Sequence, residues 1–385
     1  MANVFDYLDW RGDLTLDLVP LCDVDAVVLS RLSYLPLDGL VPPDGAPVGA
    51  LMRQLLTSKP PLLLPEDGRF IPALAASQRF CEMRIMDYVN QIDLESQTQF
   101  AAITVALGDG RHFVAFRGTD GTLVGWKEDF NMAFTCPVPA QRLAAHYAVS
   151  AMLRFPGEFL LGGHSKGGNL ALSLSLLCSK QQLDQIEGVY AFNAPGINPD
   201  MLAAYKQRAD DLDYLAKLHL IENENDVVSA FFMHLKEPEI IASCYDDRNL
   251  QQLCHAHQVY AYKLDQHGFV SAKQKSRMPK LMEAAINNVF MKQSKEKRAA
   301  FINDCLSYLR TNHTMPQIYP LFIRRIDKYT QIFNDLSYER FKVIEFDELI
   351  DRFKKELHTK AMNLSMKIFD VKTAVGELIE KINIK

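Results

Sequence analysis

Apolar and polar positions alternate along the chain in a way that predicts an α/β protein. Short apolar runs bounded by turn residues predict strands at residues 101–107, 112–116, 159–161, 188–192, 215–221 and 259–264. Stretches of helical period predict helices at residues 24–32, 141–155 and 168–177. Gly108-Asp109-Gly110, between the first two strands, predicts a hairpin. Strands that alternate with helices favour an α/β fold with a mostly parallel sheet.

Two regions depart from this alternation. Residues 35–68 are rich in Pro and Leu, which favours an irregular surface excursion. After Gly268 the chain has few Gly and Pro, and long amphipathic, charged stretches continue to the end. We therefore expect one α/β domain over residues 1–270, with 35–68 as an irregular excursion, and a helical C-terminal domain over residues 271–385.

The overall composition excludes several classes of protein. The chain has 385 residues, of which 48% are hydrophobic, too many for extensive disorder. No apolar run approaches the roughly 18 residues of a membrane helix, and the N-terminus lacks a signal-peptide pattern. The seven cysteines are odd in number and widely spaced, which is not typical of a disulfide framework. We expect a cytoplasmic protein with reduced thiols.

Charge is divided unevenly along the chain. The net charge of −5 gives no reason to expect a nucleic-acid partner. Residues 271–385 contain 22 Lys and Arg against 14 Asp and Glu, whereas the rest of the chain contains 20 against 33. The basic region is either a helical extension docked on the acidic part or a surface that contacts an anionic membrane or a partner.

The strongest chemical motif is Gly163-His164-Ser165-Lys166-Gly167, which fits the G-x-S-x-G nucleophile elbow. An apolar strand leads into it, and a helical pattern follows it. The serine of such an elbow lies on a strained turn, and side chains two residues before and after it would collide, which explains Gly163 and Gly167. A glycine-rich turn without a catalytic role is the alternative.

A serine hydroxyl needs a histidine base, which in turn needs a carboxylate to orient it. In an α/β-hydrolase fold the chain order is Ser, acid, His. Asp226 follows the predicted strand 215–221, at the sheet edge where ligand-binding loops gather. His257 directly precedes the predicted strand 259–264. We therefore expect a triad of Ser165, Asp226 and His257.

Alternatives remain for both partners of the serine. Glu222 and Glu224 compete with Asp226, and His255 and His267 compete with His257. Cys254-His255-Ala256-His257 also allows a metal site, because two histidines two residues apart can share one face of a strand. No Cys/His cluster elsewhere in the sequence completes a tetrahedral set, so we expect no metal.

Four further motifs accompany the elbow in order. They are Phe116-Arg117-Gly118-Thr119, the pair Trp126 and Asp129, Asn193-Ala194-Pro195-Gly196, and 223–228 with Asp226. Together with the elbow, they resemble the class 3 lipase family of the α/β-hydrolase superfamily over roughly residues 100–260. The lysine after the serine and the stretch 7–13 are closer still to an uncharacterised lipase-like branch of bacterial proteins, known as a domain of unknown function.

This resemblance implies roles for the remaining motif residues. Thr119 would supply one oxyanion donor through its backbone N–H, with its hydroxyl as a further candidate, and the backbone N–H of Lys166 would supply the second. Trp126 and Asp129 would support this loop, and Arg117 would be structural. Because only the backbone of Lys166 is needed, we expect its side chain to point to solvent. The alternative is a cation beside the nucleophile that favours a polar or anionic substrate.

These observations predict an α/β-hydrolase fold and a carboxylic ester hydrolase of the esterase or lipase type. The substrate would be a small-molecule or lipid acyl ester, and no metal or organic cofactor is needed. An acyltransferase or thioesterase with the same triad is the nearest alternative. The alternative from another class is a lipase-like scaffold without catalysis that binds a partner or membrane through its basic C-terminal helices.

Overall fold

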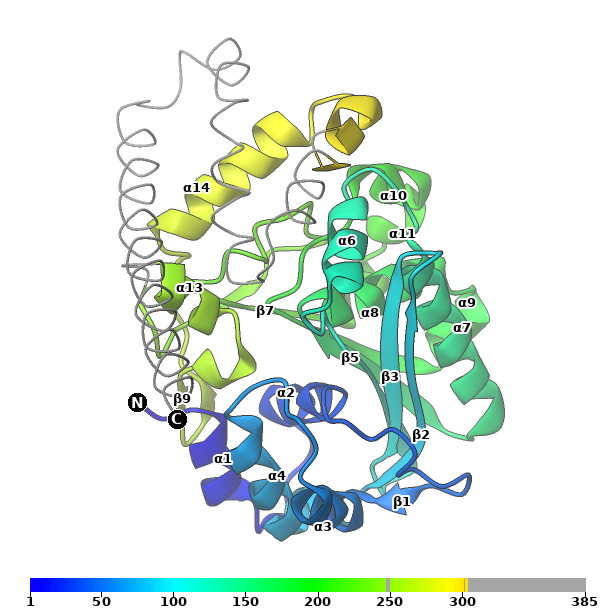
Figure 1. Ribbon diagram of the computed structural model, residues 1–385, viewed down its shortest axis with the longest axis vertical. Helices are drawn as coiled ribbons and strands as arrows, with labels where there is room; N and C mark the ends of the chain where they lie inside the picture. The colour runs from blue at the N-terminus through cyan, green and yellow to red at the C-terminus, as the bar shows by residue number, and fades with distance from the viewer. Residues whose placement is uncertain (247–249, 301, 304–385) are drawn as a thin grey trace, which may run out of the picture. The chain divides into compact units, whose positions relative to one another are not determined.

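The computed structural model describes residues 1–246, 250–300 and 302–303 (Figure 1). The chain divides into two compact units, Met1–Ile302 and Asn303–Lys385. Apart from Asn303, the second unit lies outside the described residues, and so does most of the predicted helical region 271–385.

Within the described residues, a central sheet of eight strands runs in the order β1 to β8. Its strands are β1 (Ala46–Pro47), β2 (Arg84–Asp93), β3 (Thr98–Ala106), β4 (Arg111–Phe116), β5 (Glu158–His164), β6 (Ile186–Phe192), β7 (Leu218–Asn223) and β8 (Glu239–Ile241). Strands β1 to β4 pair antiparallel, and β4 to β8 pair parallel. A separate hairpin contains β9 (Leu264–Asp265) and β10 (Gly268–Phe269). The predicted α/β fold with a mostly parallel central sheet is confirmed.

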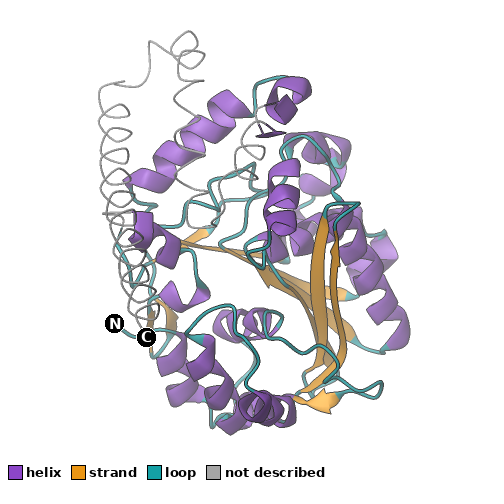
Figure 2. Cartoon of the chain, in the orientation of Figure 1, coloured by secondary structure: helices purple, strands orange, loops and turns teal. Residues whose placement is uncertain are grey.

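Helices cover both faces of this sheet (Figure 2). The first group is α1 (Val4–Arg11), α2 (Asp23–Leu32), α3 (Val48–Ser58), α4 (Asp67–Ala76) and α5 (Gln78–Cys81). The second group is α6 (Leu123–Asn131), α7 (Pro139–Arg154), α8 (Lys166–Leu177), α9 (Lys180–Asp184), α10 (Pro199–Ala204), α11 (Lys206–Ala209) and α12 (Leu212–Ala216). The last group is α13 (Leu250–Ala256), the 3₁₀ turn η1 (Val259–Ala261), α14 (Arg277–Ala285) and the π-helical turn η2 (Ile286–Phe290).

The strand order decides which helices cover which face. The parallel strands follow one another in one direction, so right-handed crossovers place α7 and α8 on the same face. The opposite face is covered by the N-terminal helices and by residues 259–269. Side chains alternate accordingly: Val114 packs against the α7–α8 layer, and Phe113 packs against the N-terminal layer.

This arrangement corrects the prediction for residues 35–68. They are not an irregular excursion, because they contain β1 and the helix α3. Val48, Leu51, Met52 and Leu55 of α3 are fully or almost fully buried in the core on the N-terminal side of the sheet. The prolines stand before and after α3 rather than inside it, where they would break the helix. The region supplies the layer that the crossover helices cannot provide.

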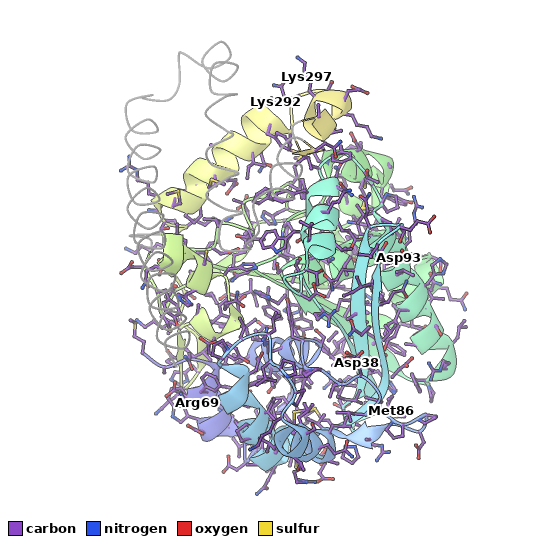
Figure 3. The ribbon with its side chains drawn as sticks, viewed as in Figure 1. Asp38, Arg69, Met86, Asp93, Lys292 and Lys297 are labelled. Carbon is purple, nitrogen blue, oxygen red and sulfur yellow. The ribbon has the colours of Figure 1, made fainter. Side chains whose placement is uncertain are left out.

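Strand β2 was not among the predicted strands. Its burial alternates only weakly, because it lies beside β3 near the antiparallel edge of the sheet and is partly exposed. Asp38 accepts hydrogen bonds from the Tyr88 hydroxyl at 3.0 Å and from the Asn90 amide at 2.9 Å. Figure 3 labels Asp38 and Met86 at this edge.

The prediction of a strand over residues 259–264 is wrong. Residues Val259–Ala261 form the turn η1, Tyr262 makes an isolated β-bridge with Ser243, and Leu264 and Asp265 form β9. The run is apolar because Val259, Tyr260 and Ala261 fill the core beneath the N-terminal helices, not because it is a sheet strand. A short apolar run does not by itself distinguish these structures.

The first unit also extends beyond the predicted boundary at residue 270. The backbone N–H of Ala272 donates to Ile240 O at 2.8 Å, and that of Ser276 donates to Glu224 O at 2.8 Å. Lys275 is buried and pairs with Glu222 at 2.7 Å. These contacts tie residues 271–276 to the ends of β7 and β8. Among the described residues, no helix has the length and apolar character needed to cross a bilayer.

Candidate active site

The carboxyl ends of β4 to β7 bring the predicted site residues to one edge of the sheet. Strand β5 ends at His164, α8 begins at Lys166, and Ser165 lies between them with φ 58° and ψ −131°. A positive φ is uncommon for a residue with a side chain and stores strain in the backbone. The Ser165 side chain remains partly exposed, although its neighbours in sequence are buried. This is the geometry that a nucleophile elbow requires.

The glycines of the elbow are needed because other backbone lies against them. A Cβ atom at Gly167 would lie 2.0 Å from the carbonyl oxygen of Phe116, and one at Gly163 would lie 2.3 Å from the carbonyl carbon of Gly167. Neither contact can be relieved by moving a side chain. The spacing predicted from the motif therefore has a steric origin.

We expect Gly167→Ala to lower the free energy of unfolding by about 1–3 kcal/mol, because the added methyl overpacks the contact between α8 and β4. Chemical denaturation measures this change. Gly68→Ala is the matched control, since Gly68 also lies in a helix but has only Leu62 Cδ1, at 4.0 Å, near the added Cβ. That variant should be neutral or slightly stabilised. Equal stability of the two variants would contradict the steric explanation.

Asp226 and His257 are in direct contact. Asp226 Oδ1 lies 2.8 Å from His257 Nδ1. The carboxylate is fully buried and accepts hydrogen bonds from the backbone N–H groups of Ser229 at 2.7 Å and Val228 at 3.2 Å. A carboxylate fixed in this way is an acceptor, so Nδ1 of His257 carries the proton and Nε2 is left as the basic nitrogen.

The backbone of His257 is held next to the elbow. His257 follows α13, and its carbonyl oxygen accepts hydrogen bonds from His164 Nε2 at 2.6 Å and Asn193 Nδ2 at 2.9 Å. The rings of His164 and His257 lie 4.7 Å apart, measured between their centroids. His164, the residue before Ser165, therefore hydrogen-bonds to the backbone of His257. Asp226 hydrogen-bonds to the side chain of His257.

His164 is a neutral, fixed imidazole. Burial lowers its pKa well below the usual value. Because Nε2 faces a carbonyl, that nitrogen carries the proton, and Nδ1 accepts the hydroxyl of Tyr34 at 3.0 Å. The sequence alone predicts no such contacts for His164, Asn193 or Tyr34. The Asn193 motif indicated a turn but not its partner.

We expect Asn193→Ala to reduce the turnover rate about tenfold, because it removes a donor to the His257 carbonyl and an acceptor for Asn223 N at 2.7 Å. Steady-state kinetics on folded protein measures the loss. Asn193→Gly is the matched variant: it removes the same amide but tolerates the local φ of 46°. It should be more stable than Asn193→Ala and equally slow. A wild-type rate in either variant would show that the amide does not position His257.

The competing candidates have other partners. Glu222 pairs with His234 at 3.0 Å and with Lys275, and Glu224 accepts the backbone N–H of Ser243 at 3.1 Å. His255 stacks on Tyr245 with ring centroids 5.1 Å apart. His267 is exposed in the turn between β9 and β10. In the part of the chain that the structure describes, no three His, Cys, Asp or Glu side chains converge to hold a metal ion.

The loop after β4 passes directly beside the elbow. A Cβ atom at Gly118 would lie 2.7 Å from the His164 carbonyl oxygen and 3.1 Å from Ser165 Cβ. Thr119 therefore begins next to the nucleophile, and its hydroxyl donates a hydrogen bond to Asp129. Lys166 is the first residue of α8, so its backbone N–H has no acceptor within the helix. The backbone at Gly118 and the first residue of α8 therefore both adjoin Ser165.

The other residues of this region have structural surroundings. Arg117 donates to Asn90 at 2.8 Å and pairs with Asp120 at 3.3 Å, which agrees with the structural role expected for it. Trp126 lies on α6, with its ring centroid 6.2 Å from that of Phe130. Asp129 is on the same helix, and burial raises its pKa to about 6, a rise that the Lys166 ammonium opposes.

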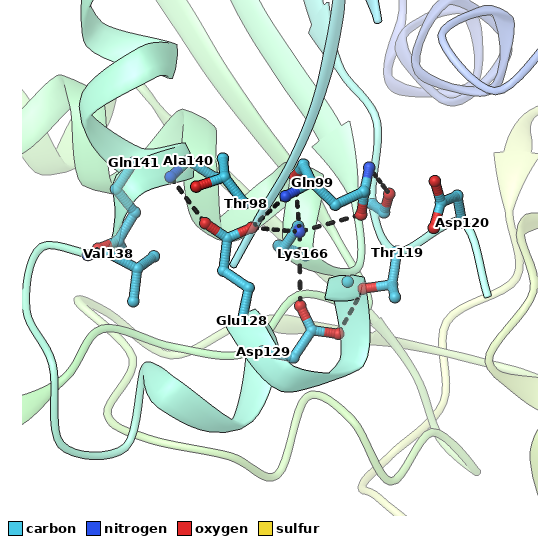
Figure 4. A network of polar contacts seen from close by, with 12 residues as sticks. Thr98, Gln99, Thr119, Asp120, Glu128, Asp129, Val138, Ala140, Gln141 and Lys166 are labelled. Carbon is cyan, nitrogen blue, oxygen red and sulfur yellow. Dashed lines mark hydrogen bonds and ion pairs between the residues drawn. The ribbon is translucent and has the colours of Figure 1, made fainter. Parts of the chain in front are cut away.

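The side chain of Lys166 does not point to solvent, and this prediction is wrong. It is 1% exposed and donates to Glu128 Oε2 at 3.0 Å, to Gln99 O at 2.9 Å and to Gln99 Oε1 at 3.0 Å (Figure 4). Glu128 also accepts the backbone N–H groups of Gln99 at 3.0 Å and Ala140 at 2.8 Å. Sequence reasoning missed Gln99 and Glu128, because nothing local indicates that they meet Lys166.

Comparisons with known proteins cover most of this region. Residues 74–307 match the model of the family described as Mbeg1-like. No curated protein is similar enough to the chain to count as a match.

Solved lipase structures are also similar to the chain. The Lip2 lipase from Yarrowia lipolytica shares 13% identity, with a TM-score of 0.34 over 51% of this chain and 82% of that chain. The M37 lipase shares 13% identity, with a TM-score of 0.35 over 71% and 82%. The Rhizomucor miehei lipase propeptide complex shares 15% identity, with a TM-score of 0.32 over 57% and 67%.

Proposed function

Because the chain belongs to the Mbeg1-like family and carries this site within the matched residues, we propose that it is a serine-dependent acyl-ester hydrolase. The contact between Asp226 and His257, held beside the strained Ser165 turn, is the observation that carries the proposal. Asp226 and His257 come from separate loops and meet beside the residue that precedes Ser165, which a glycine-rich turn without catalysis does not require.

The proposed reaction uses two proton transfers in each half. His257 Nε2 takes the Ser165 hydroxyl proton as the oxygen attacks the acyl carbonyl, and Asp226 stabilises the imidazolium that forms. His257 then gives the proton to the leaving alcohol oxygen. Water, activated by the same nitrogen, attacks the acyl-serine, and the carboxylic acid leaves as the proton returns to Ser165; the acid then loses its own proton to solvent.

The negative charge on the tetrahedral oxygen needs donors that are already in place. The backbone N–H groups of Thr119 and Lys166 are the proposed donors, and the N-terminus of α8 adds its partial positive charge. One such donor is typically worth about 3–4 kcal/mol of activation free energy. The side chain of Thr119 is not proposed as a donor to substrate, because it already donates to Asp129.

Labelling with a fluorophosphonate probe tests the proposal. The folded protein should be modified once, and mass spectrometry of the digested adduct should place the phosphonate on Ser165. A panel of acyl esters, thioesters and alcohol acceptors then separates a hydrolase from a thioesterase or an acyltransferase. Failure of the folded protein to react with the probe or with any ester would contradict the proposal.

The finer expectations from the sequence belong to this proposal as well. They are membership of the uncharacterised bacterial lipase-like branch, a cytoplasmic location, and peripheral contact of the basic C-terminal region with anionic membrane. The first rests on Lys166 and residues 7–13, the second on the cysteine pattern, and the third on the charge of residues 271–385. Binding of the full chain to anionic but not neutral vesicles would support the third.

A further inference from the structure

A network of charged side chains around a buried lysine lies next to the proposed oxyanion loop (Figure 4). Its centre is the Lys166 ammonium, which pairs with Glu128 at 3.0 Å and lies 3.7 Å from Asp129 Oδ1. The Lys166 side chain is 1% exposed and that of Glu128 is 0% exposed. Moving a charge from water into the protein interior costs free energy, and pairing with an opposite charge often only offsets that cost. We therefore ask what this buried ion pair contributes besides stability.

The three ammonium hydrogens are all in use. They are donated to the carbonyl and side-chain oxygens of Gln99 and to Glu128. An ammonium group has three donors, so none remains for a substrate. Lys166 therefore does not act as a cation that selects an anionic ester, which was one prediction from the sequence.

Two arms lead from the ammonium to the oxyanion loop. In the first, Lys166 faces Asp129, which accepts the hydroxyl of Thr119. In the second, Lys166 holds Gln99 Oε1, while Gln99 Nε2 donates to the carbonyl oxygen of Gly118 at 3.4 Å. Both arms end on the residues that lie against the elbow.

We infer that Lys166 is a positioning residue: its buried ammonium fixes β3 and α6 against the start of α8, directly after Ser165, and so holds the Thr119 loop ready for the oxyanion. The role of the loop rests on the proposed function, whereas the fixing of α6 does not. The same residue would thus serve the site twice, with its backbone N–H as a donor and its side chain as the anchor of the opposite donor.

Electrostatics explains why a cation is needed here. Glu128 and Asp129 are adjacent acids, and Asp120 adds a third negative group near Asp129. Without Lys166, burial and mutual repulsion would favour protonation of Asp129. A protonated Asp129 can itself donate a hydrogen bond. The Thr119 hydroxyl could then accept from Asp129 instead of donating to it, and the hydrogen bond would no longer have one fixed direction.

The test compares Lys166→Met with the wild type. We expect kcat to fall about 10- to 100-fold with KM nearly unchanged, because the loop acts on the transition state. The acid limb of the pH profile of kcat should move to higher pH. Hydrogen exchange in α6 should become faster, and this readout does not depend on any activity.

Arg79→Met is the matched control. Arg79 pairs with Asp25 in a salt bridge with the same exposure, 1% and 0%, among the N-terminal helices. That variant should lose stability but keep the kcat of its folded fraction and the exchange rate of α6. Normal kcat and normal α6 exchange in Lys166→Met would overturn the inference.

The double variant Lys166→Met with Glu128→Gln separates positioning from stability. Removing both charges should restore much of the stability, because the fully buried carboxylate of Glu128 is no longer left without its cation. It should not restore kcat, because both arms still lack the ammonium. Recovery of the wild-type kcat would mean that Lys166 only balances Glu128. If the wild type itself were inactive, faster α6 exchange in Lys166→Met would support the anchoring of α6 while the proposed function failed.

Discussion

Ser165→Ala is expected to reduce ester turnover about 10⁴- to 10⁶-fold, the largest effect of any substitution in this chain. Alanine cannot form the acyl intermediate, and what remains is the catalysis that the oxyanion donors and His257 provide to a direct attack by water. Because alanine occupies the same strained φ as serine, the fold should be unchanged. The measurement is kcat with an activated ester, together with thermal unfolding.

Ser175→Ala is the control for this prediction. Ser175 lies in α8, the helix that follows Ser165, and contacts the Leu172 carbonyl and the Tyr214 hydroxyl, both at 2.8 Å. Its loss should cost stability by about 1 kcal/mol and leave kcat intact. If Ser165→Ala retained a substantial share of the wild-type rate, the nucleophile would have to be another residue.

Asp226→Asn is expected to lower kcat about 10⁴-fold while KM changes little. The asparagine oxygen can still accept the backbone N–H of Ser229, which turns the amide NH₂ toward His257. Nδ1 of His257 must then accept rather than donate, so the proton moves to Nε2 and the base is lost. The protein should remain folded because the side chain has the same shape.

Glu224→Gln and Glu222→Gln are the controls, since both were competing candidates for the acid. Glu224 contacts only the backbone N–H of Ser243 through its side chain in the described contacts, so its variant should keep the wild-type rate. Glu222→Gln breaks buried pairs with His234 and Lys275 and should lose stability more than kcat. A loss of turnover in Glu224→Gln as large as in Asp226→Asn would reject the assignment of the acid.

Local patterns determined most of the strands and helices that carry the site. The β3–β4 hairpin, α7, β5 and α8 were predicted from apolar runs, turn residues and helical period, because these patterns reflect burial against the sheet or a neighbouring helix. The elbow could also be predicted from the sequence, because Gly163 and Gly167 are required by backbone contacts within the motif and with the adjacent strand β4. Asp226 was found by its place at a strand end.

Only the tertiary structure decided how these parts meet. His257 was predicted as the base because it precedes the predicted strand 259–264, and that strand is not formed. It nevertheless contacts Asp226, because α13 and η1 direct the chain back over the sheet. Residues 35–68 were predicted as an irregular excursion because prolines indicate turns. They are ordered instead because the strand order leaves one face of the sheet without crossover helices, and these residues help to cover that face. Lys166 reaches Gln99, 67 residues away in sequence, and Glu128, 38 residues away. Sequence periodicity reports whether a position is buried, but the partner of a buried charge depends on which strands lie side by side.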